Sequence, residues 1–286
     1  MTFKNKNDKK RRTVFLAVWL LLIAAIVIGI LLLWPPGEKH ESIQEMMQDG
    51  VLHEHNKIHF FGLAVNPSVV SAYTVTAILL LGALILRIFV IPKFKSVPGK
   101  FQSLIEMLVE FFSGMAKQNS HHRPNFVGAY IFSAGTYIFA STLFELFGIQ
   151  AISTTGHSIA LPAPLADINA AIAMGFLSYG VILGAGLLCG GIRGGLSVLK
   201  DFSLPISMSF RIFGALLSGL LVTELVYYYV ALSFVLPVIV GVLFTLLHAV
   251  IQTYVLATLV SIFYGEAVEP RPKKVKKSQK NKEMKV

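Results

Sequence analysis

The sequence predicts an all-α membrane protein with about six membrane helices, the last two long and tilted, plus an amphipathic interfacial helix. Of its 286 residues, 55% are hydrophobic and only 14% are charged, which is far more apolar than a soluble domain of this length. Several runs of about 20 or more mostly apolar residues are each long enough to cross a hydrocarbon core as a helix. The alternating pattern of a membrane β-barrel is absent, so helices are the spanning structure that we expect.

The apolar runs define six predicted spans. These are residues 13–34, 68–92, 126–149, 167–191, 202–230 and 235–264. The last two run longer than an upright crossing needs, and tilt accommodates the excess length. A tilted helical pair presents one long flank to a neighbour.

The positions of the positive charges predict the orientation of the chain. With six crossings and an internal N-terminus, the internal segments are residues 1–12, 93–125, 192–201 and 265–286, and they hold 21 of the 25 Lys and Arg residues. Cytoplasmic loops of membrane proteins are enriched in Lys and Arg, so both termini are predicted to be cytoplasmic. The same distribution argues against nucleic acid as the reason for the formal charge of +10.

The N-terminal region begins with a basic leader, residues 1–12, followed by the first span, residues 13–34. That span resembles a secretory signal in having basic residues before it. Its apolar core is longer than a usual signal, however, and W-P-P-G-E-K follows where a small-residue cleavage site belongs. We therefore expect an uncleaved extra helix.

Three features of the sequence resemble binding motifs of other proteins, but none of them predicts a metal, cofactor or catalytic site in this chain. His53, His55 and His59 in the external segment, residues 35–67, leave a metal site open, but matched carboxylate or cysteine ligands are missing. The G-G-I-R-G-G connection lacks the Gly-Lys-Ser/Thr ending of a phosphate loop and follows a membrane helix, so this chain is not expected to hydrolyse ATP by itself. Cys189 is a lone cysteine, so no disulfide is expected.

A segment after the second span predicts the amphipathic helix. Its sequence is V-P-G-K-F-Q-S-L-I-E-M-L-V-E-F-F, and one helical face carries Phe101, Leu104, Ile105, Leu108, Val109 and Phe112. Such a helix can lie at the cytoplasmic membrane interface. A surface helix that faces a protein partner is the alternative.

Arg211 lies near the middle of the apolar stretch 201–230. A guanidinium stays charged in proteins, so at bilayer depth it needs a partner, a wet cavity or a function. Gly214, Ala215 and Ser218 follow it at spacings that form a strip of small residues, which another helix can approach closely. A partner carboxylate at mid-membrane would have its pKa lowered by Arg211 and would release its ion. The alternative is an arginine paired within its own chain, with Gln252 as acceptor.

Further polar groups lie in or near the spans, and each also has a structural explanation. Glu145 is about one turn from the outer end of its helix and can reach water, and Asp167 can be an N-cap. His248 and Gln252 can hydrogen-bond neighbouring helices. Together with Glu224, about 20 Å beyond Arg211 along the helix, they place titratable groups in the outer half of the membrane. This arrangement indicates an ion path from outside to a fixed central charge.

Three motifs resemble the a subunit of the membrane sector of F-type ATP synthases, over residues 68–269. They are V-P-G-K-F-Q-S-L-I-E at 97–106, A-D-I-N at 166–169, and L-P-I-S-M-S-F-R-I-F-G-A-L-L-S-G at 204–219, with Gln252 at a matching position on the last helix. The resemblance implies a membrane domain over residues 68–265, followed by a basic cytoplasmic tail, residues 266–286. It also implies a stator in a bacterial plasma membrane, beside a ring of c subunits and with b subunits of the peripheral stalk as further partners.

The same resemblance implies roles for individual residues. Two offset half-channels lead protons or sodium ions to the ring carboxylate, while Arg211 separates the channels and drives deprotonation. The remaining ion-translocation residues would be Gln252, Glu224, His248, Ser207, Asp167, Asn169 and Glu145.

Three positions depart from the family pattern. Ala215 stands where many relatives have Asn, and Leu220 stands nine residues after the arginine, where Glu or His is common. His248 lies four residues before Gln252, whereas some relatives have a titratable residue seven before it. The outer channel of this chain is therefore expected to differ in its residues, and the coupling ion, proton or sodium, stays open.

Two other classes of function were weighed against the stator. A stand-alone secondary ion transporter with an intramembrane Arg/Glu site would show paired repeats or broken helices in its two halves, and the halves lack convincing similarity. A purely structural scaffold would tolerate replacement of Arg211.

Overall fold

The computed structural model describes residues 18–21, 58–60, 63–152, 158–228 and 236–269. The basic leader, most of the first predicted span, His53, His55 and residues 270–286 lie outside this part of the chain. Within the first predicted span, residues 18–21 are helical.

The described part of the chain is built of long helices. They are α3 (Pro67–Ile85), α4 (Lys100–Asn119), α5 (Pro124–Phe144), α6 (Ile168–Leu199), α7 (Ser203–Tyr228) and α8 (Leu236–Val268). α3 continues through a π-helical turn, Leu86–Val90, and a 3₁₀ turn, Ile91–Lys93. Shorter 3₁₀ turns, Glu145–Phe147 and Pro164–Ala166, follow α5 and precede α6. The all-α prediction is confirmed.

Four stretches of the described chain are long and apolar enough to cross a membrane. They are Pro67–Lys93, Pro124–Phe147, Ile168–Leu199 and Gly241–Val268. They correspond to the second, third, fourth and sixth predicted spans, whereas the first lies almost entirely outside the described residues. α7, the predicted fifth span, has 26 residues but carries Arg211, Glu224 and several serines, which lower its hydropathy. Six crossings, and the tilt of the last two, therefore stay predictions.

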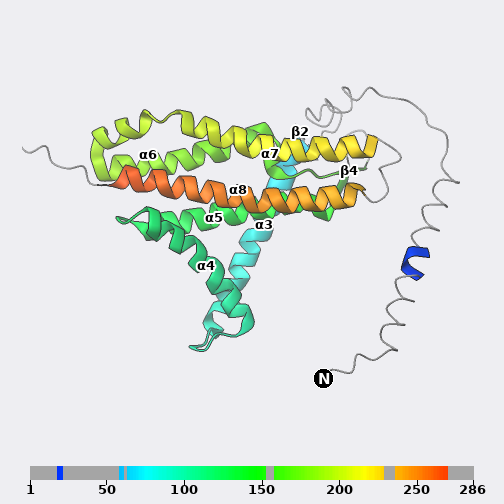
Figure 1. The fold of residues 1–286 in the computed structure, drawn as a ribbon, viewed down its shortest axis with the longest axis horizontal. Coiled ribbons are helices and arrows are strands. Elements are labelled where there is room, and N and C mark those ends of the chain that lie inside the picture. The colour runs from blue at the N-terminus through cyan, green and yellow to red at the C-terminus, as the bar shows by residue number, and fades with distance from the viewer. Residues whose placement is uncertain (1–17, 22–57, 61–62, 153–157, 229–235, 270–286) are drawn as a thin grey trace, which may run out of the picture.

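The four helices α5, α6, α7 and α8 run along the long axis of the molecule and form its body (Figure 1). Their buried residues join Phe112 and Ala116 of α4 in a single apolar cluster. α3 and α4 diverge from this body and meet at their far ends, so that they form a V beside it (Figure 1). The long flank formed by α7 and α8 is consequently on the body of the molecule, away from the tip of the V.

α6 is two helices joined by a sharp reversal at Gly191, whose φ of 60° suits a glycine. The segment after the reversal packs back on the first, and the Tyr179 hydroxyl donates to the Val198 carbonyl at 3.2 Å. Gly186 and Gly194 let the two backbones touch, since a Cβ on Gly194 would overlap the Gly186 carbonyl. The G-G-I-R-G-G sequence thus serves as a tight helical hairpin. Residues 192–199, expected in a connection, are helical.

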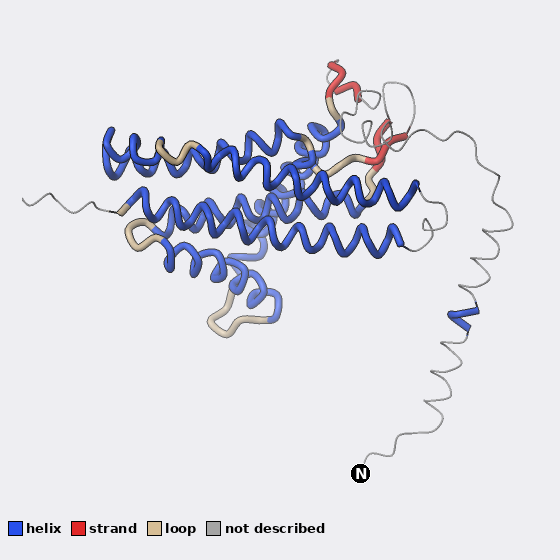
Figure 2. Tube along the Cα trace, turned by 45° about the horizontal axis from the view of Figure 1, so that its top comes forward, coloured by secondary structure: helices blue, strands red, loops and turns tan. Residues whose placement is uncertain are grey.

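Two small antiparallel hairpins lie at one end of the bundle (Figure 2). β1 (Ile58–Phe60) pairs with β2 (Leu63–Val65), and β3 (Gln150–Ile152) pairs with β4 (Ser158–Ala160). A second apolar cluster beneath them contains Ile58, Val75, Phe144 and Leu161. These strands were not predicted, because three-residue strands are too short for a reliable alternation pattern.

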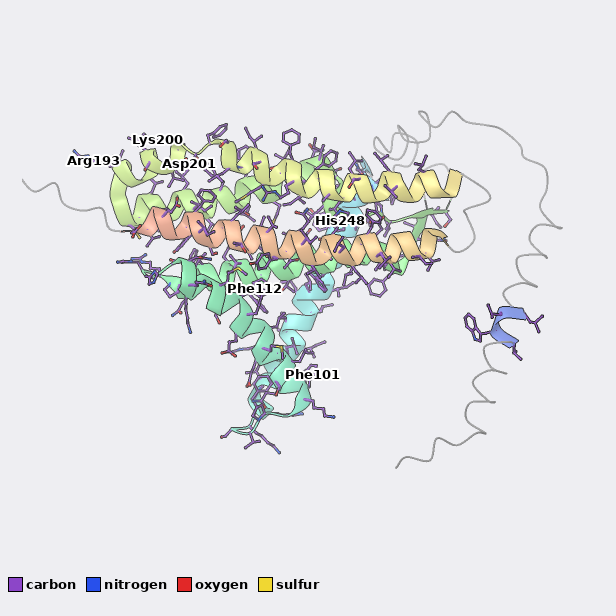
Figure 3. The ribbon with its side chains drawn as sticks, in the orientation of Figure 1. Phe101, Phe112, Arg193, Lys200, Asp201 and His248 are labelled. Carbon is purple, nitrogen blue, oxygen red and sulfur yellow. The ribbon has the colours of Figure 1, made fainter. Side chains whose placement is uncertain are left out.

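α4 has the amphipathic character that its sequence predicts, and its two halves differ in burial. Phe112 and Ala116 are buried against the bundle, whereas Phe101 and Leu104 near the start of the helix are exposed. Figure 3 shows Phe101 at the tip of the V and Phe112 where α4 meets the body. The reciprocal hydrogen bonds between the Gln102 amide and the Lys95 backbone hold the turn between α3 and α4.

Candidate functional site

Arg211 lies on the outward face of α7, and its side chain is exposed. The opposite face of the same turns carries Met208, Ile212 and Leu216, which recur every four residues and are buried in the main cluster. Within the described part of the chain, neither a hydrogen bond nor an ion pair reaches the guanidinium. The structure therefore does not show the arginine paired inside its own bundle.

The surface around Arg211 is made of small residues. Gly214 and Ser218 are exposed, Ala215 is half-buried, and Ser207 is exposed one turn before the arginine. The Ser218 hydroxyl donates to the Ala215 carbonyl at 2.8 Å, so it is satisfied without projecting far from the helix. We call Arg211, Gly214, Ala215 and Ser218 the arginine strip. It offers a flat helix surface from which one long cation projects.

Gln252 of α8 ties the two long helices together at the level of the arginine. Its side chain is only 6% exposed, and its Nε2 donates to the backbone carbonyl oxygen of Arg211 at 3.4 Å. The contact is to the backbone, so the guanidinium is left available to another group. Gln252 therefore positions the turn that carries the arginine.

A cavity of about 260 Å³ lies between α5, α7 and α8, beyond Arg211 towards the C-terminal end of α7. It is lined by Thr142, Glu145, Leu146, Leu216, Gly219, Val238, Gly241, Val242, Thr245 and His248. Leu216 is five residues beyond Arg211, so the cavity comes within about 8 Å of the arginine along the helix axis. The carboxylate of Glu145 and the imidazole of His248 line the same cavity, which has room for several water molecules. Such groups can accept, hold and pass on protons.

His248 is half-buried between α7 and α8, as Figure 3 illustrates. Its ring lies 5.9 Å from the ring of Phe244, centroid to centroid, and its Nδ1 is 3.8 Å from the position that a Cβ on Gly219 would occupy. The imidazole therefore lies within van der Waals range of α7 at Gly219. His248, which lines the cavity, and Gln252, which contacts the backbone of Arg211, lie one helical turn apart on α8.

The other predicted site residues fall in different places. Glu224 lies within α7, and its side chain is outside the described part of the structure. Asp167 is the N-cap of α6: its carboxylate accepts from the backbone N–H of Asn169 at 2.7 Å. Both residues line a separate groove of about 470 Å³ between α3 and α6. They are therefore not brought together with Glu145 and His248.

Sequence reasoning missed Thr142, Thr245 and the two glycines of the cavity. One signal for Thr245 existed, because it occupies the position seven before Gln252, where some relatives have a titratable residue. Near the N-terminal end of α7, Asp201 and Glu266 line a pocket of about 70 Å³ between α6, α7 and α8. Neither was singled out, since both lie at ends of apolar stretches, where a charge is ordinary.

The described residues contain no group of three or more His, Cys, Asp or Glu side chains that could hold a metal ion. Of the three histidines noted in the external segment, His59 lies in β1, and the other two fall outside the described residues.

Comparison with known proteins gives a family match and a similar protein that agree with each other. A family model described as "ATP synthase A chain" matches residues 71–265, which is more than half of the chain. The chain is also similar to a protein named ATP synthase subunit a from Methylobacterium sp. (strain 4-46). The two are 29% identical over 194 residues, which cover 61% of this chain and 77% of the relative.

Proposed function

This chain belongs to the ATP synthase A chain family, and on that premise we propose that it is the stator subunit that conducts ions to and from a rotating ring of c subunits in an F-type ATP synthase. It is an integral membrane protein and a subunit of the ATP synthase membrane sector. Catalysis of ATP formation belongs to other subunits, and b subunits of the peripheral stalk hold this one in place.

The observation that supports this proposal most is the exposed guanidinium of Arg211 on the arginine strip, which has no hydrogen-bond or ion-pair partner among the residues that the structure describes. A charge in the middle of a membrane is costly unless a group of opposite charge pairs with it. A small-residue surface next to it allows a neighbouring helix to come close. A ring carboxylate carried past this surface is the partner that the chemistry fits.

In this mechanism, Arg211 acts on the ring carboxylate by electrostatics alone. An adjacent guanidinium stabilises the ionised form of a carboxyl group and lowers its pKa by about 1 to 3 units. The incoming acid therefore releases its ion beside Arg211. Because the guanidinium stays charged, it also repels cations and separates the two access paths.

The cavity that contains Glu145 and His248 serves as the outer access path, with Glu224 further towards the outer surface. On the inner side, the pocket that contains Asp201 and Glu266 supports an exit towards the cytoplasm. One charge crossing 100 mV releases about 2.3 kcal/mol, so several ions must pass for each ATP.

Cross-linking tests the proposed contact with the ring. In a Cys189→Ser background, which removes the exposed native thiol, Ser218→Cys is expected to form a disulfide with a cysteine placed mid-membrane on the outer helix of the ring subunit. Ile78→Cys on α3, which is also exposed at 55%, is the matched control and should give no such product. Absence of a ring in the purified complex, or equal cross-linking at both positions, would contradict the stator assignment.

Removing a carboxylate from the outer path should slow ion flux. We expect Glu145→Gln to lower the initial rate of ATP-driven pumping in inverted membrane vesicles by about tenfold, because a carboxyl group that can accept and donate protons is lost from the path. Glu224→Gln is expected to act in the same direction. Glu110→Gln, on the exposed face of α4, removes a carboxylate elsewhere and serves as the control. An unchanged rate for Glu145→Gln would take this residue out of the path.

The coupling ion is decided by a measurement on the whole complex. If protons are carried, ATP hydrolysis is independent of added sodium and an uncoupler of the proton gradient stimulates it. If sodium is carried, hydrolysis rises with sodium concentration, and a sodium ionophore takes the place of the uncoupler.

A further inference from the structure

The N-caps of α3 and α6 are joined by a hydrogen bond across 101 residues of sequence. Asn66 caps α3, since its Oδ1 accepts from the backbone N–H of Ser68 at 3.0 Å. Asp167 caps α6 through Oδ1. The Nδ2 of Asn66 donates to Oδ2 of Asp167 at 2.7 Å, which is a short, charge-assisted bond.

In this arrangement each polar side-chain atom of Asn66 and Asp167 takes part in a hydrogen bond. One Asp167 oxygen accepts from its own helix and the other accepts from Asn66, while Asn66 uses its carbonyl for α3 and its amide for Asp167. Both oxygens of the carboxylate are thus held by donors from two different helix ends. Such a group is suited to anchoring the two helix ends, and poorly suited to giving and receiving an ion on each passage.

α3 is held to the rest of the molecule near its first turns, by this anchor and by the apolar cluster that includes Val75. Its buried residues are confined to its outer turns and are Pro67, Ser68, Ser71 and Val75. Beyond Val75 the helix is largely exposed on its way to the tip of the V. The position of α3 is thus set at its first turns.

The anchored end of α3 packs on the outer access path. Val75 belongs to the apolar cluster that contains Phe144 and Leu161. Phe144 is 3% exposed and immediately precedes Glu145, which lines the cavity beside His248. A displacement of α3 would therefore be transmitted through Val75 and Phe144 to the carboxylate of the cavity.

We propose that Asn66 and Asp167 form a linked cap pair whose role is to position Glu145 in the outer cavity, by fixing the outer end of α3 on α6. Asp167 and Asn66 are then positioning residues. This proposal rests on the proposed function, because the effect of the pair is measured as ion flux. It replaces the role in ion transfer that the family resemblance implies for Asp167.

Exchanging the two side chains separates positioning from ion transfer. Asn66→Asp alone places two carboxylates in contact and, at alkaline pH where both are ionised, should lower ATP-driven pumping by about tenfold. Asp167→Asn alone keeps a cap and a neutral hydrogen bond, so a loss of no more than about threefold is expected. The double variant Asn66→Asp/Asp167→Asn restores one carboxylate, one amide and both caps, and should pump at nearly the native rate.

Each variant is assayed in the intact complex in vesicles, with pumping normalised to the amount of complex in the membrane. If Asn66→Asp does not assemble, recovery of both assembly and pumping in the double variant supports the pair equally well. Gln150→Glu adds one negative charge to the exposed β3 strand and controls for charge alone.

Two results would overturn the linked cap pair. The first is normal pumping by Asn66→Asp. The second is a double variant that stays as impaired as the worse single variant. Pumping would then depend on a carboxylate at position 167 itself or on the residue at position 66 alone, and not on the bond between them. Neither result bears on the stator assignment, which stands or falls with the cross-link from the arginine strip and with Arg211.

Discussion

Replacing Arg211 with alanine is expected to abolish ATP-driven ion pumping while the complex still assembles. The exposed guanidinium makes no contact within the described chain that folding would lose. Its removal takes away the charge that lowers the pKa of the ring carboxyl by about 1 to 3 units, so release of the ion falls by about 10- to 1,000-fold at a given pH. A stator that acts through this charge stops working, whereas its packing is unchanged.

The measurement is pumping by inverted vesicles at matched amounts of assembled complex. Arg193→Ala is the control, because Arg193 is also exposed but lies at the hairpin of α6, at one end of the bundle (Figure 3). Arg193→Ala should pump normally. Native pumping by the Arg211→Ala complex would remove the central premise of the proposed function.

Local patterns in the sequence predicted much of the helical structure and the most distinctive residue of the site. The apolar runs at 126–149 and 235–264 became α5 and α8 with small shifts at their ends, because burial in lipid or in a bundle selects continuous apolar helices. Arg211 stood out because a permanent charge in such a run is expensive. Gln252 was singled out as a neighbour of Arg211 by the family resemblance, and in the structure it donates to the backbone carbonyl of Arg211.

The remaining features depend on contacts between distant segments, which periodicity does not record. The bond between Asn66 and Asp167 is one example, because either residue alone predicts only a helix cap. The outer cavity is another, since its walls include Thr142, Gly219 and Gly241, whose types are unremarkable in membrane helices. Only the packing of α5, α7 and α8 shows that these positions share one space.

The glycines of α6 illustrate the same limit and lead to a second large expected effect. Read along the sequence, G-G-I-R-G-G looks like a flexible connection, but Gly194 is buried against the backbone of Gly186 in the folded hairpin. A methyl group at position 194 would overlap the Gly186 carbonyl oxygen, and backbone atoms cannot move aside as a side chain can. The two arms of the hairpin would have to separate.

Gly194→Ala is therefore expected to lower the yield of assembled complex severely, since overpacking of this kind costs about 1–3 kcal/mol and here opposes a backbone contact. The separated arms would also displace the start of α7, which follows the hairpin directly and carries the arginine strip. Gly184→Ala makes the same substitution in the same helix, where a Cβ meets nothing within 4 Å, and should assemble normally. Immunoblots of membranes after detergent extraction and native electrophoresis compare the two. Equal assembly of both variants would show that the hairpin tolerates a wider spacing than the Gly186–Gly194 contact implies, and that the position of Arg211 does not depend on it.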